Sequence, residues 1–168
     1  MRILSWNCHG AFRRKFQLLD GFDADVLVIQ ECEEPNALSD DYLTWAGNHL
    51  WVGANKHKGI GIFVKNDHKL EKLDWPSEEA ALFLPVQIND TIQMVGVWTQ
   101  AAKSSSSSYV GQLWQYLKLN RGRLTNATIL CSDFNSNKQW DKPRGLWSHS
   151  KCVADLSNLG IFSLYHEL

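Results

Sequence analysis

The sequence predicts an α/β domain with a mixed β-sheet. Several segments have the composition of strands, and some, such as Val26–Ile29, are continuous apolar runs typical of strands covered on both faces. Residues 81–88 and 91–99 are strand-like and are joined by the two-residue turn Asn89–Asp90, which predicts a hairpin. Because helical segments lie between other strands and supply the crossovers that parallel pairs need, the sheet is expected to be mixed.

Strands are expected throughout the chain, at residues 2–8, 25–31, 59–65, 81–88, 91–99, 127–131 and 161–165. A first helical face is formed by Phe12, Phe16 and Leu19, and Gly21 is its expected end. Further helices are expected where Val110, Leu113, Trp114 and Leu117 form an apolar stripe, and over residues 150–159 before Gly160.

Composition is that of a single soluble globular domain. The chain has 168 residues, of which 44% are hydrophobic and 21% charged, and it shows no internal repeat or domain boundary, so residues 1–168 are taken as one domain. The net charge of −1 gives no general attraction to nucleic acid, so polyanion binding would need a local patch or a metal. The sequence leaves the oligomeric state open.

Cysteine usage and the N-terminus indicate a cytoplasmic protein. No Cys-x-x-Cys pair occurs among Cys8, Cys32, Cys131 and Cys152, so we expect reduced core thiols rather than a zinc site or disulfides. The N-terminal residues lack the basic and apolar regions of a signal peptide, and no apolar run is long enough to span a bilayer. A membrane partner is therefore not expected.

Polar residues are placed where three apolar strands end. Trp6–Asn7–Cys8 ends the first strand, Gln30–Glu31 ends the second, and Ser132–Asp133–Phe134–Asn135 follows the strand at residues 127–131. Ligands gather at strand ends in covered sheets because side chains can converge there in a crevice. The three clusters could therefore form one site.

The residue types at these strand ends suit phosphoryl chemistry. Glu31 offers a hard oxygen ligand for Mg²⁺ (or Mn²⁺), Asn7 a neutral oxygen beside it, and Asp133 a carboxylate able to orient or deprotonate water. Asn135 can hold a phosphate oxygen or the attacking water. Each residue alone also fits an ordinary solvated, turn or capping role.

Taken together, four ordered segments resemble motifs of the endonuclease/exonuclease/phosphatase family. They are Ile3–Asn7, Ala24–Glu31, Gly59–Phe63 and Ser132–Asn135. The resemblance implies an α/β fold in which a sandwich of two mixed sheets is flanked by helices, with a metal site at one edge.

The resemblance also implies roles for individual residues. Glu31 matches the metal-ligating glutamate, and Asn7 matches the asparagine beside it. Asp133 and Asn135 match the residues that position the nucleophile and the phosphate, with Ser132 in place of a glycine. Gln100 falls near the place where many members carry His or Tyr, and it could donate a hydrogen bond to substrate but cannot act as an acid.

The family pattern continues beyond the last segment of this chain. Past a segment like residues 161–166, the resemblance implies a further strand and a terminal Ser-Asp-His motif, and neither occurs in the 168 residues. We therefore expect a partial domain with an incomplete second sheet and weak or no activity alone. Losing such a phosphate-binding His removes transition-state stabilisation of roughly 3–4 kcal/mol in comparable sites.

Further residues could contact substrate. Trp140 could stack on a base or sugar and Arg144 could pair with phosphate, although packing at the core or rim is an equal interpretation. His57 and Lys58 could approach a phosphate, but a solvated loop is the commoner role of such residues.

The sequence therefore predicts a Mg²⁺-dependent phosphodiester hydrolase, foremost a nuclease acting on DNA or RNA. The alternatives are a small-molecule or lipid phosphoesterase, or a non-catalytic domain that binds a phosphorylated ligand or a protein.

Overall fold

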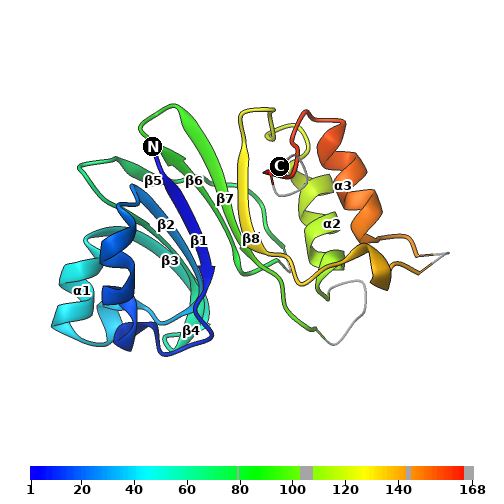
Figure 1. Ribbon diagram of the computed structural model, residues 1–168. Coiled ribbons are helices and arrows are strands. Elements are labelled where there is room, and N and C mark those ends of the chain that lie inside the picture. The colour runs from blue at the N-terminus through cyan, green and yellow to red at the C-terminus, as the bar shows by residue number, and fades with distance from the viewer. Residues whose placement is uncertain (79, 103–107, 143–144, 165–168) are drawn as a thin grey trace.

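The chain folds into two β-sheets packed face to face, with helices on both outer sides (Figure 1). The computed structural model describes residues 1–168 except 79, 103–107, 143–144 and 165–168. The expected α/β sandwich of two mixed sheets is confirmed, and each sheet has four strands in the order β1-β2-β4-β3 or β5-β6-β7-β8.

Each sheet contains one parallel pair, which makes both sheets mixed. In the first sheet β1 and β2 are parallel, and in the second β7 and β8 are parallel, whereas all other neighbours are antiparallel. The strands are β1 (Ile3–Asn7), β2 (Val26–Cys32), β3 (Asn48–Asn55), β4 (Lys58–Val64), β5 (Leu70–Lys72), β6 (Phe83–Ile88), β7 (Ile92–Trp98) and β8 (Ile129–Asp133).

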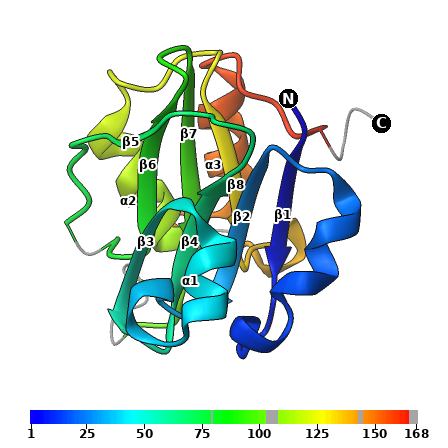
Figure 2. The same cartoon turned by 90° about the vertical axis from the view of Figure 1, so that its left-hand side faces the viewer.

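The helices form the two outer layers (Figures 1 and 2). Over the first sheet lie the 3₁₀ helices η1 (Phe12–Arg14), η2 (Phe16–Phe22) and η3 (Pro35–Ala37) and the helix α1 (Asp40–Ala46). Over the second sheet lie α2 (Val110–Asn120) and α3 (His149–Ser157), with the 3₁₀ helix η5 (Lys138–Trp140) following β8. None of the described helices is long and apolar enough to cross a membrane.

Three buried clusters fill the spaces between the four layers. The apolar run of β2 is continuous because both faces of this strand are buried: Val26 and Val28 face the second sheet, while Leu27 and Ile29 face the outer helices. The outer cluster contains Phe12, the central cluster joins the two sheets, and a third cluster packs β6 and β7 against α2 and α3. Burial on both faces therefore fixes how the two sheets lie against each other.

Glycines in β4 allow large aromatic side chains of the first sheet to lie close to its backbone. A Cβ at Gly59 would lie 2.3 Å from the carbonyl oxygen of Val52 and 2.4 Å from the ring of Trp51. A Cβ at Gly61 would lie 2.6 Å from the ring of Phe63. The Gly-x-Gly pattern of this strand thus has a packing cause, and it holds β4 close to β3 and β2.

Six of the seven expected strands are present, and the hairpin turn is confirmed. Asn89 and Asp90 both have positive φ, of 50° and 57°, as a two-residue hairpin turn requires. Residues 161–163 are not strand, so the expectation of a strand at residues 161–165 is wrong for the described part of that segment. The sequence interpretation missed β3, β5 and α1.

The first helical face is buried as expected, but its conformation differs. Phe12, Phe16 and Leu19 are buried against the first sheet. The segment forms two short 3₁₀ helices broken at Lys15, whose ammonium donates to the carbonyl oxygens of Cys8 and Gly10. These bonds tie the segment to the chain leaving β1.

Candidate functional site

The site is built at the ends of β1, β2 and β8, where one amide joins two carboxylates. Asn7 Nδ2 donates to Glu31 Oε1 at 3.1 Å and to Asp133 Oδ2 at 2.7 Å. β1 and β2 are parallel neighbours, so Asn7 and Glu31 lie at the same end of the strands of the first sheet. Asp133 ends β8 of the second sheet, and its bond to Asn7 spans 126 residues of sequence. The predicted convergence of these three clusters is therefore what the fold produces.

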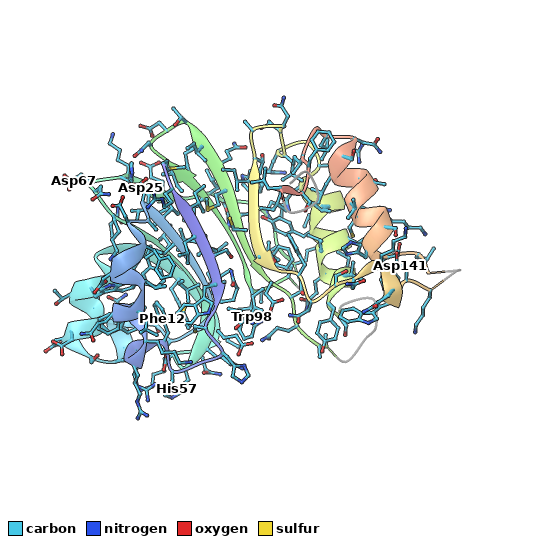
Figure 3. All side chains as sticks on the ribbon, in the orientation of Figure 1. Phe12, Asp25, His57, Asp67, Trp98 and Asp141 are labelled. Carbon is cyan, nitrogen blue, oxygen red and sulfur yellow. The ribbon has the colours of Figure 1, made fainter. Side chains whose placement is uncertain are left out.

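The site lies at one end of the sandwich. Figure 3 shows Trp98, the last residue of β7, and His57, in the turn between β3 and β4, at the lower end toward which β1 points. Trp98 is the register partner of Asp133. Asp25 and Asp67 lie at the opposite end of the sandwich (Figure 3). The site is thus formed by strand ends and by the loops that leave them.

A β-bulge aims the carboxylate of Glu31. The register between β2 and β4 pairs Gln30 with Ile60 and Cys32 with Gly59, which leaves Glu31 as the extra residue. Glu31 has a φ of 63°, a left-handed conformation that costs a non-glycine residue about 1–3 kcal/mol. Bulges of this kind re-aim a side chain next to functional sites. The surrounding strand pairs hold Glu31 in this conformation.

The turn after β8 fixes Asp133 and Asn135 together. The backbone N–H of Asn135 donates to Asp133 Oδ1 at 3.3 Å, and Asn135 Nδ2 donates to the carbonyl oxygen of Thr99 at 3.0 Å. Thr99 in turn donates its hydroxyl to the carbonyl oxygen of Phe134 at 2.7 Å. Asn135 has a φ of 43°, a second left-handed residue in the site. The turn is therefore held by side chains and backbone of the β7 end.

Ser132, which stands where the family resemblance implies glycine, has a structural partner. Its hydroxyl donates to the carbonyl oxygen of Val97 in β7 at 2.9 Å. A side chain at this position is accommodated within the β7–β8 pair, so the exchange leaves the turn that follows intact.

Charged neighbours keep Glu31 ionised. Burial raises the pKa of this carboxyl, but hydrogen bonds from Lys58 and Asn7 and the charges of Lys58 and His9 outweigh burial and hold the pKa below its ordinary value. Lys58 Nζ lies 2.8 Å from Glu31 Oε2, and His9 Nδ1 lies 4.0 Å from the same oxygen. Lys58 also lies over the ring of Trp98, 5.4 Å from its centroid.

Sequence reasoning did not connect Lys58 or His9 with Glu31: Lys58 was weighed only as a possible phosphate contact against a solvated loop, and His9 was not considered. The pairing of Lys58 with Glu31 depends on the bulge in β2, which no local pattern reveals. His9 follows Asn7 by two residues, and its backbone N–H donates to Asn7 Oδ1 at 3.0 Å. Its proximity to a motif residue was the one signal that could have identified it.

The donor set suits a weakly coordinated hard cation rather than a closed metal site. Within the described ranges, no three His, Cys, Asp or Glu side chains are grouped so that they could hold a metal. Asn7 presents its amide nitrogen to the carboxylates, and its oxygen accepts from the backbone of His9. A site in which one ionised carboxylate binds the cation, while water and phosphate supply the remaining ligands, is compatible with Mg²⁺, because this ion keeps much of its hydration shell. The metal roles of Glu31 and Asn7 remain predictions.

Two of the three predicted substrate contacts, Gln100 and Trp140, lie outside this hydrogen-bonded group. The backbone N–H of Gln100, two residues beyond Trp98, donates to Gln112 Oε1 at 3.0 Å, which ties Gln100 to α2. Trp140 lies in η5 and is 63% exposed, so it does not serve core packing. Arg144 lies outside the described residues.

Two further side chains near the turn, those of Trp147 and His149, make structural contacts. Trp147 packs against Trp114 with ring centroids 6.1 Å apart. His149 Nδ1 lies 3.1 Å from the hydroxyl of Ser136, and its backbone N–H donates to Asp141 at 2.7 Å. Asp141 therefore caps the start of α3 and does not orient the imidazole.

The cysteines are free thiols with little nucleophilic character. Cys8, Cys32 and Cys152 are buried, and Cys131 is half-buried. Burial raises the pKa of Cys8 to about 11 and that of Cys131 to about 11. Thiolate is therefore scarce near neutral pH, which supports their interpretation as structural thiols.

Comparisons with known proteins identify the fold. No family model matches the chain, and no curated protein sequence matches it. The endonuclease domain of TRAS1, a telomere-specific non-LTR retrotransposon, superposes with a TM-score of 0.59 at 16% identity, over 95% of this chain and 70% of that one. A 3′-5′ exonuclease from Neisseria meningitidis gives 0.62 at 16% identity, over 95% and 71%.

A third solved structure carries the family name itself. An endonuclease/exonuclease/phosphatase family protein from Bacteroides thetaiotaomicron gives a TM-score of 0.54 at 18% identity, over 82% of this chain and 64% of that one. The chain therefore spans about two thirds of the length of these structures. At such identities the likeness establishes the fold, and the resemblance drawn from the four motifs is confirmed at that level.

Proposed function

We propose that this chain provides the metal-binding and water-orienting part of a Mg²⁺- or Mn²⁺-dependent phosphodiester hydrolase, and that its substrate is DNA or RNA. One observation carries the proposal: Asn7 Nδ2 contacts Glu31 and Asp133 at once, at 3.1 and 2.7 Å. A carboxylate for a cation and a carboxylate for a water are thereby placed on either side of one amide.

Glu31 is the residue suited to hold the cation. Its pKa is held low, so it is ionised at neutral pH, and its side chain is only 13% exposed. When bound, Mg²⁺ would polarise a phosphate oxygen and offset the negative charge that develops during hydrolysis. Asn7 could add its amide oxygen after rotation of the amide group, or could remain as the group that orients both carboxylates.

Asp133 is the residue suited to orient the attacking water and receive its proton. Two donors fix its carboxylate, Asn7 Nδ2 on one oxygen and the Asn135 backbone N–H on the other. A fixed carboxylate at a strand end satisfies the geometric requirement for a general base. Asn135 keeps one Nδ2 hydrogen beyond its bond to Thr99, and this hydrogen could bind a phosphate oxygen.

Nucleic acid is the substrate class best supported. Two of the structures with this fold are a retrotransposon endonuclease domain and a 3′-5′ exonuclease. The exposed ring of Trp140, which follows the catalytic turn, adds a surface on which an unpaired base could stack. We propose Trp140, Gln100 and Arg144 as its substrate contacts.

A second candidate is a domain that binds phosphate or a protein without hydrolysis. Gln100 favours it, because an amide cannot protonate a leaving group. The two candidates differ in whether a bound phosphodiester is hydrolysed.

A titration with Mg²⁺ followed by hydrolysis assays separates these functions. We expect Mg²⁺ to raise the thermal unfolding temperature of the wild type but not of Glu31→Gln, while Asp133→Asn retains the shift and loses turnover. Substrates would be plasmid DNA, abasic duplex, RNA and an aryl phosphodiester. Equal Mg²⁺ shifts in wild type and Glu31→Gln would refute the metal site. Because weak or no activity is expected of these 168 residues alone, turnover would be assayed in the longest natural chain, where a metal shift without turnover on any substrate would favour the binding domain.

A further inference from the structure

Lys58 provides a positive charge at the oxygen that the proposed function gives to a metal. Its ammonium lies 2.8 Å from Glu31 Oε2, while Glu31 Oε1 accepts from Asn7. The side chain of Lys58 is 50% exposed and that of Glu31 is 13% exposed. Both oxygens of the carboxylate are thus engaged, one by an amide and one by a cation.

A divalent cation and this ammonium cannot share the same position on Glu31. They would repel each other at short range, and Oε2 is where Lys58 and the ring of His9 already converge. Leaving Glu31 costs the Lys58 side chain little, because it is 50% exposed and its other contact, with the ring of Trp98, does not depend on this ion pair. Cation binding at Glu31 therefore requires the ammonium to move.

The surroundings define where the ammonium can go. Lys58 lies over the ring of Trp98, whose register partner is Asp133. A lysine that leaves Glu31 can keep its contact with this ring while its ammonium turns toward the space beside Asp133, where the proposed function places phosphate.

We propose that Lys58 is an exchangeable counter-cation: it neutralises Glu31 until a divalent cation displaces it, and then pairs with the phosphate of the substrate. This inference rests on the proposed function. It gives Lys58 two positions, one in the metal-free site and one in the metal-loaded site. A permanent salt bridge with a purely structural role would occupy only the first.

The first test measures metal affinity without turnover. Mn²⁺ binding would be followed by electron paramagnetic resonance in wild type, Lys58→Met and Lys58→Gln, with Lys56→Met as control, since Lys56 is an exposed lysine of the same turn. Removing the Lys58 ammonium, which competes with the cation for Glu31, should tighten Mn²⁺ binding by about two- to fivefold, because such an ion pair contributes little free energy. Lys56→Met should change it much less.

The second test measures phosphate binding. Inorganic phosphate would be titrated by calorimetry into the Mg²⁺-saturated proteins, and both Lys58 variants should bind it about tenfold more weakly than wild type. Circular dichroism and urea midpoints would confirm that the variants are folded. If Lys58→Met does not fold, both tests would rely on Lys58→Gln.

The outcomes separate this inference from the function on which it rests. Wild-type protein that binds no Mn²⁺ would overturn both. Wild-type protein that binds Mn²⁺, with equal or weaker binding in both Lys58 variants, would overturn the exchange alone. Tighter Mn²⁺ binding with unchanged phosphate affinity, or wild type that binds no phosphate, would overturn the transfer of Lys58 to phosphate.

Discussion

Replacing Asn7 by aspartate should turn the bridging amide into a source of repulsion. In Asn7→Asp, a carboxylate oxygen takes the place of the nitrogen that lies 3.1 Å from Glu31 Oε1 and 2.7 Å from Asp133 Oδ2. Three carboxylates then meet at the ends of β1, β2 and β8. The variant keeps the size of the side chain, so the expected effect is electrostatic.

The distances set the size of this effect. Two carboxylates that relax to about 4 Å repel by about 4 kcal/mol at an effective dielectric constant of about 20, and partial exposure reduces this to about 1 kcal/mol per pair. Loss of two hydrogen bonds to charged acceptors adds about 1 kcal/mol or more. We expect the free energy of unfolding to fall by about 3 kcal/mol at pH 8, or about 6–12 °C in melting temperature.

The pH dependence distinguishes repulsion from a packing defect. In the variant, repulsion from the neighbouring negative charges raises the folded-state pKa of the introduced carboxyl above its unfolded value near 4. The folded variant therefore binds more protons than the unfolded chain, and its penalty is full above the raised pKa and disappears as the pH falls toward about 4. A packing defect would instead lower the free energy of unfolding by the same amount at pH 8 and at pH 4.

Urea unfolding of wild type and variant in EDTA, at intervals from pH 8 to pH 4, measures the loss of unfolding free energy and its dependence on pH. Asn137→Asp is the control, because Asn137 is exposed and its capping oxygen is retained, so its effect should stay within about 0.5 kcal/mol. A loss below about 1 kcal/mol at pH 8, or a loss independent of pH, would refute the bridging role of Asn7. Mn²⁺ should restore part of the lost stability by neutralising the three carboxylates.

Three further predictions concern β4, Glu31 and the thiols. Gly59→Ala should lose about 3 kcal/mol of unfolding free energy, because its Cβ would meet strand backbone at 2.3 Å, whereas Gly122→Ala, with open space around it, should lose less than 1 kcal/mol in urea unfolding. The pKa of Glu31 is lowered on folding, so the stability that this carboxylate contributes is present above its unfolded pKa of about 4.3 and is lost as the pH falls through the folded pKa. The difference in unfolding free energy between wild type and Glu31→Gln in EDTA should therefore shrink on acidification. A difference that stays constant with pH would contradict this. Iodoacetamide at pH 7.5 should alkylate Cys8 and Cys131 far more slowly than a free thiol, since burial raises each pKa to about 11; equal rates by mass spectrometry would contradict their burial.

Strand-end placement, together with the four segments that resemble family motifs, predicted which residues meet. Asn7 and Glu31 end neighbouring parallel strands, and Asp133 ends a strand of the facing sheet, so all three reach one end of the sandwich. The runs of buried apolar residues also predicted most strands, because full burial leaves a strong compositional signal. These features depend on local sequence and on the direction of the strands.

What could not be predicted depends on tertiary pairing. Strand β3 (Asn48–Asn55) is half-buried with polar ends, β5 (Leu70–Lys72) has only three residues at an edge, and α1 (Asp40–Ala46) buries only two side chains. Such elements are stabilised by their neighbours more than by their own pattern. The position of Lys58 likewise follows from a register shift between β2 and β4, which the sequence of either strand alone does not specify.

The site also has a structural role, because it joins two sheet edges. Among the described strands, β1 and β8 each pair with a neighbour on one side only. The bond from Asn7 to Asp133 connects these two edges at the end where the carboxylates meet. A change that moves β8 away from β1 would therefore separate Asp133 from Asn7 and Glu31, and a cation bound at Glu31 would act next to a contact that joins the two sheets.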